Sequence, residues 1–197
     1  MVRDVVAKSG AEVIAFSPNF VDIALHQSTF SHGERQHSGL LDVSEELFAA
    51  IDLPIDVRNL WADQTRSIFA NYFVAKHRFW KTWFGYTEKI FDICEEQNTP
   101  LAAKLTELTQ HRGRRDQYQM KIFIMERLVN ALLEMLNINA ASNFNFPYQR
   151  DIYSADMTSM GHNPADFDTF LLFDALKGAF IKTRQPQYLN VFGFTFQ

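Results

Sequence analysis

The sequence predicts a helix-rich α/β protein with a small sheet that includes strands near residues 12–16 and 67–74. Two observations carry this prediction. Residues 68–74, IFANYFV, form a short apolar run rich in β-branched and aromatic side chains, which is typical of a buried strand. From Lys76 to Gln97 the apolar side chains then recur at steps of three, four or seven. That spacing predicts a helix of about five or six turns.

The composition limits the class of protein. The chain has 197 residues, of which 47% are hydrophobic, so we predict a single domain over residues 1–197. The net charge of −4 argues against a nucleic-acid partner, because phosphate-backbone binding needs clustered lysine and arginine. The single cysteine, Cys94, is consistent with a reducing compartment, and no apolar run reaches the roughly 20 residues of a membrane span. The sequence therefore predicts a cytoplasmic protein without a membrane span.

The first quarter of the chain alternates short elements with polar segments. Residues 4–9 predict the end of a short helix, and residues 12–16 predict the first strand. Because parallel strands need a crossover of a dozen or more residues, we expect this strand to lie parallel to residues 68–74. Residues 20–26 are weakly helical, whereas residues 27–39 are polar, lack a period and predict a loop long enough to be functional.

The remaining elements follow from cap and period signals. We expect a helix over residues 45–51, capped by Asp42 or Ser44. Further along, the sequence predicts a helix over 101–109 that begins after Thr99 and Pro100, a buried helix over 119–136, a loop over 137–151, irregular chain over 154–162, a helix from Asn163 to about Thr183, and a short helical segment over 187–192.

A polar junction lies between the predicted central strand and the long helix after it. Asn71, Tyr72, Lys76 and His77 are its polar side chains. Open α/β sheets place their ligand crevices at such junctions. Asn71, Tyr72 and Lys76 are therefore the first candidates for ligand binding.

The polar segment at residues 27–39 contains the next group of candidates, His32, Glu34 and His37. Zinc needs three or four ligands in tetrahedral geometry, and neither this spacing nor a cysteine partner matches a zinc signature. The sequence therefore predicts no metal ligands. Two interpretations stay open, a solvated loop and a substrate loop in which Glu34 or His37 forms hydrogen bonds to a hydroxyl-rich ligand.

Glu126 and Arg127 are adjacent charges in an otherwise apolar helix. Such groups are costly to bury unless they are paired or used. A stripe formed by Glu126, Asn130 and Glu134 likewise needs partners or a water-filled cavity. Structural ion pairing and a role in a site are the two interpretations.

Three segments together carry a resemblance to a known group. They are His32-Gly33-Glu34 with His37-Ser38-Gly39-Leu40, then Phe69 to Lys76 followed by Phe79-Trp80, and then Lys121 to Leu128. In this order they resemble bacterial proteins described as glycosyltransferases of surface-polysaccharide clusters. The resemblance implies that the chain forms the C-terminal portion of a GT-A-like domain, with Asn71, Lys76, Glu126 and Arg127 near a sugar site.

The function that this resemblance implies is sugar or nucleotide-sugar binding in bacterial surface-polysaccharide synthesis. The candidate catalytic residues are Glu126 and Glu34, and the candidate substrate-binding residues are His37, Asn71, Tyr72, Lys76 and Arg127. A divalent metal cofactor is expected only if a binding site for the sugar donor is completed elsewhere. The alternative is a non-catalytic interaction module that docks a protein partner or a second copy through exposed aromatic side chains such as Trp61, Phe84 or Phe194.

Overall fold

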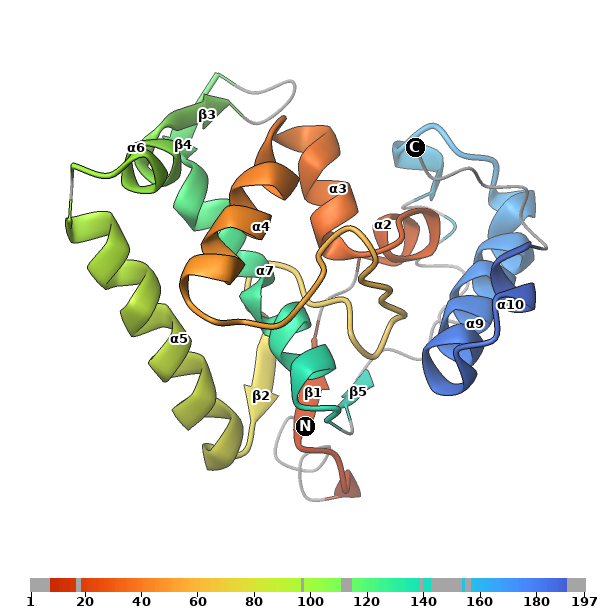
Figure 1. Cartoon of the computed structure of the whole chain (residues 1–197). Coiled ribbons are helices and arrows are strands. Elements are labelled where there is room, and N and C mark those ends of the chain that lie inside the picture. The colour runs from red at the N-terminus through yellow and green to blue at the C-terminus, as the bar shows by residue number, and fades with distance from the viewer. Residues whose placement is uncertain are drawn as a thin grey trace.

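The computed structural model describes residues 8–16, 19–96, 98–110, 115–138, 140–142, 154 and 157–190. Helices dominate this part of the chain, and two small sheets accompany them (Figure 1). The helices are α2 (Phe20–Leu25), α3 (Thr29–Gln36), α4 (Leu40–Ala50), α5 (His77–Glu95), α6 (Pro100–Thr106), α7 (Met120–Met135), the 3-10 helix η2 (Pro164–Asp166), α9 (Phe167–Thr183) and α10 (Gln187–Asn190). The strands are β1 (Val13–Ala15), β2 (Phe73–Ala75), β3 (Leu108–Gln110), β4 (Gln117–Gln119) and β5 (Ala140–Ser142). The prediction of a helix-rich protein with a small sheet is therefore confirmed.

The larger sheet has the strand order β2-β1-β5. Strand β1 pairs with β2, as predicted, but the pairing is antiparallel, with Val13 opposite Ala75. The parallel partner of β1 is β5, where Ala140 lies opposite Val13. The sequence analysis placed residues 140–142 in a loop over 137–151, a segment rich in asparagine and aromatic residues. Pairing with the buried strand β1 overrides that weak local preference.

The predicted strand over residues 67–74 is wrong in extent. Strand β2 starts only at Phe73, and its side chains are half-buried rather than covered on both faces. Before it the chain turns, since the N–H of Tyr72 donates to the carbonyl of Phe69 at 3.1 Å. Ile68 is fully buried. The apolar run therefore reflects burial of separate side chains and a turn, not one continuous strand.

Helix α7 forms the centre of the main hydrophobic core. It contacts α3, α4, α5 and α6, and in Figure 1 it passes through the middle of the molecule, with α5 along one side. Ile124, Leu128 and Leu132 are fully buried. The prediction of a helix that is buried nearly all round is confirmed. Removal of this apolar surface from water stabilises the fold by roughly 25 cal/mol per Å².

A second hydrophobic cluster lies between α2 and α9. The ring of Phe20 packs on Phe167 and Phe170, with centroid distances of 4.9 and 6.2 Å. Asn163 caps η2 by accepting the N–H of Ala165 at 3.0 Å, which confirms the predicted start of this region. In Figure 1, α9 and α10 lie on the side of the molecule opposite α5.

Residues 27–39 do not form the predicted loop, because helix α3 occupies most of them. Ser28 and Ser31 form a capping box, in which each backbone N–H donates to the hydroxyl of the other residue, at 3.0 and 3.3 Å. Phe30 is the one large apolar side chain that α3 buries. A single such residue produces no hydrophobic period, which is why the sequence pattern did not reveal this helix.

Smaller differences occur elsewhere. Helix α6 ends at Thr106, because residues 108–110 pair with residues 117–119 instead of extending the helix. Residues 157–159, which were predicted to be irregular, are helical. The predicted helix end at residues 4–9 lies almost wholly outside the described residues, as does Phe194. Among the helices described here, none is both long and apolar enough to cross a membrane.

Candidate functional site

Two contacts bring α3 together with segments far from it in the sequence. The ring of His37, the residue after α3, stacks on Phe123 of α7 with the centroids 3.5 Å apart. His32 meets Phe69 edge to face at 5.3 Å. The three segments that the sequence analysis singled out, around residues 32–40, 69–80 and 121–128, therefore meet at α3.

Arg127 makes the third contact between these segments. Its Nε donates to the carbonyl of Thr29 at 2.8 Å, and its Nη1 donates to the carbonyl of Phe123 at 2.7 Å. Gly33 makes room for this guanidinium, since a Cβ at that position would lie 2.5 Å from Nε. Burial lowers the pKa of Arg127 to about 10, against the opposing effect of Glu126, so the side chain stays charged at neutral pH. Arg127 therefore joins α7 to α3 from a buried position.

Glu34 and His37, two of the predicted site residues, lie on α3 and at its C-terminal cap. The two carboxylate oxygens of Glu34 accept the N–H groups of Gly39 and Leu41, each at 2.8 Å. This carboxylate explains why α4 begins at Leu40, before the predicted cap residues. His37 is only 1% exposed. Both residues are thus engaged within the fold.

Two residues of the stripe, Glu126 and Glu134, lie against positive charges, whereas the buried amide nitrogen of Asn130 has no hydrogen-bond partner among the residues that the structure describes. An Oε2 of Glu126 lies 3.6 Å from Nη1 of Arg127, and the Glu126 side chain is 38% exposed. Glu134 pairs with Arg66 at 3.2 Å and also with Arg184. The structural interpretation of the stripe is therefore confirmed for Glu134, and Glu126 keeps a solvent-facing carboxylate.

The predicted polar junction is a tight turn on the surface. Ala70 and Asn71 adopt φ values of +50° and +56°, in the left-handed region that side chains other than glycine rarely occupy. Tyr72, which follows them, is 61% exposed. Lys76 is also exposed, and its N–H donates to the carbonyl of Glu12 at 2.9 Å, which fixes the start of α5. The structure leaves Asn71, Tyr72 and Lys76 open to solvent, on either side of β2.

A cavity of about 240 Å³ lies elsewhere, between α9 and the loop after α7. Asp63, Arg66, Asn137 and Lys182 supply its polar lining. Neither Asn71 nor Lys76 contributes to it, so the predicted ligand crevice does not coincide with this cavity.

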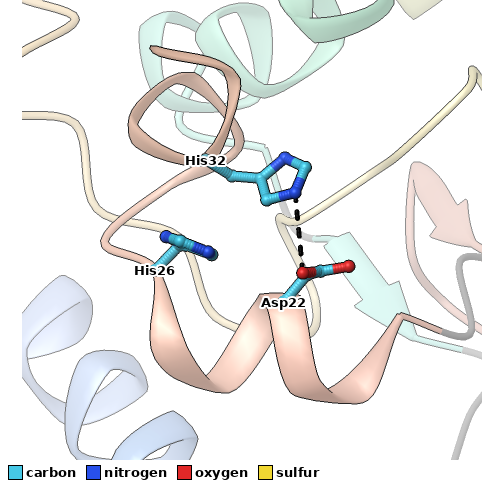
Figure 2. Close-up of side chains that lie close together, drawn as sticks. All are labelled: Asp22, His26 and His32. Atoms are coloured by element: carbon cyan, nitrogen blue, oxygen red, sulfur yellow. Dashed lines mark ion pairs between the residues drawn. The ribbon is translucent and has the colours of Figure 1, made fainter. Parts of the chain in front are cut away.

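Three side chains that the sequence analysis did not group together converge between α2 and α3. They are Asp22 on α2, His26 at the C-terminal cap of α2, and His32 on α3 (Figure 2). One ligand atom from each lies within 4.8 Å of the others, and Asp22 Oδ1 lies 3.5 Å from His32 Nε2. All three side chains are half-buried. Burial, together with the positive charges of Arg35 and Lys177, lowers the pKa of His26 to about 4, so His26 is neutral at pH 7.

A buried polar network borders this cluster. Lys177 of α9 donates to the carbonyls of Ile23 and His26, the second at 3.0 Å. Asp174, one turn earlier, accepts the N–H and the Nε2 of Gln64 at 2.8 and 2.9 Å. Burial raises the pKa of Asp174 to about 6 while the charge of Lys177 opposes the shift, and burial lowers the pKa of Lys177 while Asp174 opposes it. The network therefore ties α9 to the C-terminus of α2.

The sequence contained a weak signal for these residues. Asp22 and His26 are four residues apart, and Asp174 and Lys177 are three apart, which places each pair on one side of a helix. The arrangement of His32 opposite them depends on how α2 and α3 pack, which no spacing reveals. Comparisons of this chain with known protein families, with curated proteins and with solved structures found no match.

Proposed function

We propose that this chain binds a sugar acceptor or a nucleotide-sugar as a GT-A-like domain of a glycosyltransferase that acts in bacterial surface-polysaccharide synthesis. The observation that carries the proposal is the meeting at α3 of the three segments that resemble such proteins. The three segments are far apart in the sequence, so nothing in their spacing requires them to touch. Contact between them is expected if all three contribute to one site, as the resemblance implies.

The turn at residues 69–72 is the best-supported location for the ligand. A non-glycine residue in the left-handed region costs roughly 1–2 kcal/mol, and Ala70 and Asn71 both adopt it. Strained backbone of this kind persists where the surroundings impose it, and it concentrates at ligand sites. Because Phe69 contacts His32, the turn is held against α3 while Asn71 and Tyr72 face solvent.

Each exposed side chain of this surface suits part of a nucleotide-sugar. The amide of Asn71 both donates and accepts hydrogen bonds, as recognition of a hydroxyl requires. The ammonium of Lys76 offers a positive charge to a phosphate. Glu126 supplies a half-exposed carboxylate as the candidate base, whereas Glu34 is occupied by two backbone N–H groups, so we assign it to the fold.

A thermal-shift titration with nucleotide-sugars, with and without Mn²⁺, tests the proposal. A ligand at one hundred times its dissociation constant stabilises a protein by about 2.7 kcal/mol. For a chain of this length, that gain corresponds to a rise of roughly 5–10 °C in melting temperature. The variant Asn71→Gly/Lys76→Ala should lose the shift, because glycine keeps the turn but removes the amide. Lys81→Ala, which removes an exposed charge of α5, is the matched control and should keep it. An unchanged melting temperature at millimolar ligand, for every sugar and nucleotide-sugar tried, would refute the proposal.

A second candidate function is favoured by one observation on α5. Trp80, Phe84 and Phe91 repeat at four and seven residues, so they share one side of the helix, and the last two are 53% and 62% exposed. An aromatic surface of this kind is typical of docking sites. Trp61, another aromatic residue of this hypothesis, is half-buried, and its ring centroid lies 5.5 Å from that of Phe180.

Phe84→Ser separates the two functions. If the chain is a docking module, this substitution should abolish self-association measured by light scattering, whereas Asn71→Gly/Lys76→Ala should leave it unchanged. If the chain is a sugar-binding domain, Asn71→Gly/Lys76→Ala should abolish the rise in melting temperature caused by the ligand, whereas Phe84→Ser should leave that rise unchanged.

A further inference from the structure

We propose that Asp22, His26 and His32 bind one divalent transition-metal ion between α2 and α3. The proposal is independent of the proposed function, since it rests on the arrangement of these side chains alone. Asp22 lies in the first turn of α2 and His26 is its C-terminal cap, and His32 faces them from the next helix (Figure 2). The three therefore approach one point from two elements, as metal ligands do.

The distances fit a small ion. Zinc binds imidazole nitrogen and carboxylate oxygen at about 2.0–2.2 Å, so tetrahedral ligand atoms lie roughly 3.3–3.5 Å apart. Asp22 Oδ1 and His32 Nε2 are already 3.5 Å apart, and all three ligand atoms lie within 4.8 Å of one another. Separations of up to 4.8 Å exceed the tetrahedral spacing, so the ligand atoms must move closer together when the ion binds.

The ligand types indicate which ion would bind. Two imidazoles with one carboxylate suit zinc and its neighbours in the transition series, whereas magnesium and calcium prefer oxygen ligands. Three protein ligands leave a fourth position, and because all three side chains are half-buried, that position is reachable by water or by a substrate atom. Phe69 meets His32 edge to face at 5.3 Å, so the cluster adjoins the first residue of the turn at residues 69–72.

The surroundings hold the ligands in place. Lys177 donates to the carbonyl of His26 at 3.0 Å, which fixes the backbone of that ligand at the helix end. The positive charge of Lys177 opposes a bound cation, and the carboxylates of Asp174 and Asp63 offset part of that charge. Asp22 supplies the negative charge within the cluster itself.

The proposal is tested by adding Zn²⁺ or Co²⁺ to the chelator-treated chain and measuring the bound ion by calorimetry and by the visible absorption of Co²⁺. One ion per chain is expected, with a Co²⁺ spectrum typical of tetrahedral nitrogen and oxygen ligands. Loss of an outer hydrogen-bond partner of a metal ligand costs roughly 10–100-fold in affinity, so His26→Gln and His32→Gln should each cost more than that.

His162→Gln is the matched control. His162 is also half-buried and also lies against an aromatic ring, Phe170 at 5.5 Å, but it is outside the cluster. It should bind the ion as wild type does. If a histidine variant does not fold, Asp22→Asn serves in its place, because it keeps the shape and removes the anionic ligand. Absence of binding, or equal binding by the control and the cluster variants, would show that Asp22 and His32 form only an ion pair and would overturn the proposal.

Discussion

Gly33→Ala should destabilise this protein even though it places a better helix former in α3. An alanine Cβ at this position would lie 2.5 Å from Nε and 2.9 Å from Cζ of Arg127, and 3.1 Å from Cδ1 of Leu40. The guanidinium is buried and bonded to two carbonyls, so it cannot simply swing into solvent. The added methyl group must therefore displace Arg127 from at least one of its partners.

The change that Gly33→Ala makes in the free energy of unfolding is the difference between two opposing effects. Alanine gains about 1 kcal/mol over glycine in a helix interior. A hydrogen bond to a charged group contributes about 1.5–3 kcal/mol, and the bond from Arg127 Nε to the carbonyl of Thr29, 2.8 Å long, is the one closest to the new methyl group. The difference is a net loss of about 0.5–2 kcal/mol.

Gly85→Ala is the matched control, because Gly85 also lies inside a helix and a Cβ there meets no atom within 4 Å. It should gain about 1 kcal/mol. The two variants should thus differ by roughly 1.5–3 kcal/mol in urea unfolding, or by about 3–12 °C in melting temperature. Equal stability of the two variants would refute the role given to Arg127. So would an equal cost of Gly33→Ala in an Arg127→Met background, where the clash is absent.

Three further substitutions test other contacts. Ala70→Gly should stabilise the chain by about 0.5–1 kcal/mol in urea unfolding, because glycine adopts a φ of +50° without strain; a loss of stability would show that the turn is relaxed. Glu34→Gln should cost about 1 kcal/mol, because a neutral amide interacts less well with the N–H groups at the start of α4; an unchanged thermal melt would contradict this. Asp174→Asn and His26→Gln should change the pH dependence of stability in opposite directions. The pKa of Asp174 is raised from 3.8 to about 6, so its contribution is complete below pH 3.8 and is lost as the pH rises through 6. The pKa of His26 is lowered from 6.5 to about 4, so its contribution is complete above pH 6.5 and is lost as the pH falls through 4. Between pH 4 and 6, stability should rise with pH more steeply in the asparagine variant than in wild type and less steeply in the glutamine variant, by at most about 1.4 kcal/mol per pH unit. Parallel curves for all three proteins would contradict both assignments.

The long helices were predictable because several local signals agree in them. The helix expected over 76–97 is α5, the helix expected over 119–136 is α7, and the helix expected from Asn163 to Thr183 is η2 together with α9. Every end agrees to within two residues. In α5 a hydrophobic period persists over several turns, α7 is apolar nearly all round along its length, and at the start of η2 the cap residue and the following proline mark where the helix begins. Length made these predictions robust, because one misplaced residue does not change the period.

The elements that were missed depend on contacts beyond their own residues. Helix α3 buries Thr29, Phe30 and Gly33. Gly33 is buried because the side chain of Arg127 packs against it, and Arg127 lies 94 residues further along the chain (127 − 33). Strand β5 consists of small residues and exists through its pairing with β1. No window of sequence contains the partner in either case.

The sequence indicated several residues of the candidate sites, but it did not indicate which of them lie together in space. Asn71, Tyr72 and Lys76 were expected at a strand-to-helix junction, and they are exposed just before and just after β2. His32 was considered as a ligand, but with His37, which is buried on Phe123. Its neighbours in space, Asp22 and His26, belong to a helix whose sequence pattern is weak.

Helices α2 and α3 belong to different hydrophobic clusters. Phe20 of α2 packs with α9, whereas Phe30 of α3 packs in the main core. The chain between the two helices is held by polar contacts, including the bond from Gln27 Nε2 to the carbonyl of Arg58 at 2.8 Å. Each contact of this kind contributes only about 0.5–1.5 kcal/mol net, since water replaces it when it breaks. This junction is therefore weaker than either cluster.

An ion held by Asp22 and His26 on one helix and by His32 on the other would cross-link the two clusters at that junction. Because the ligands come together only when both helices are in place, the ion would bind the joined arrangement and not a separated one. Its binding free energy would then stabilise the relative position of α2 and α3 directly, by mass action. The turn at residues 69–72 touches the same junction through the contact of Phe69 with His32, so the ion would also fix the surface on which we place the sugar ligand.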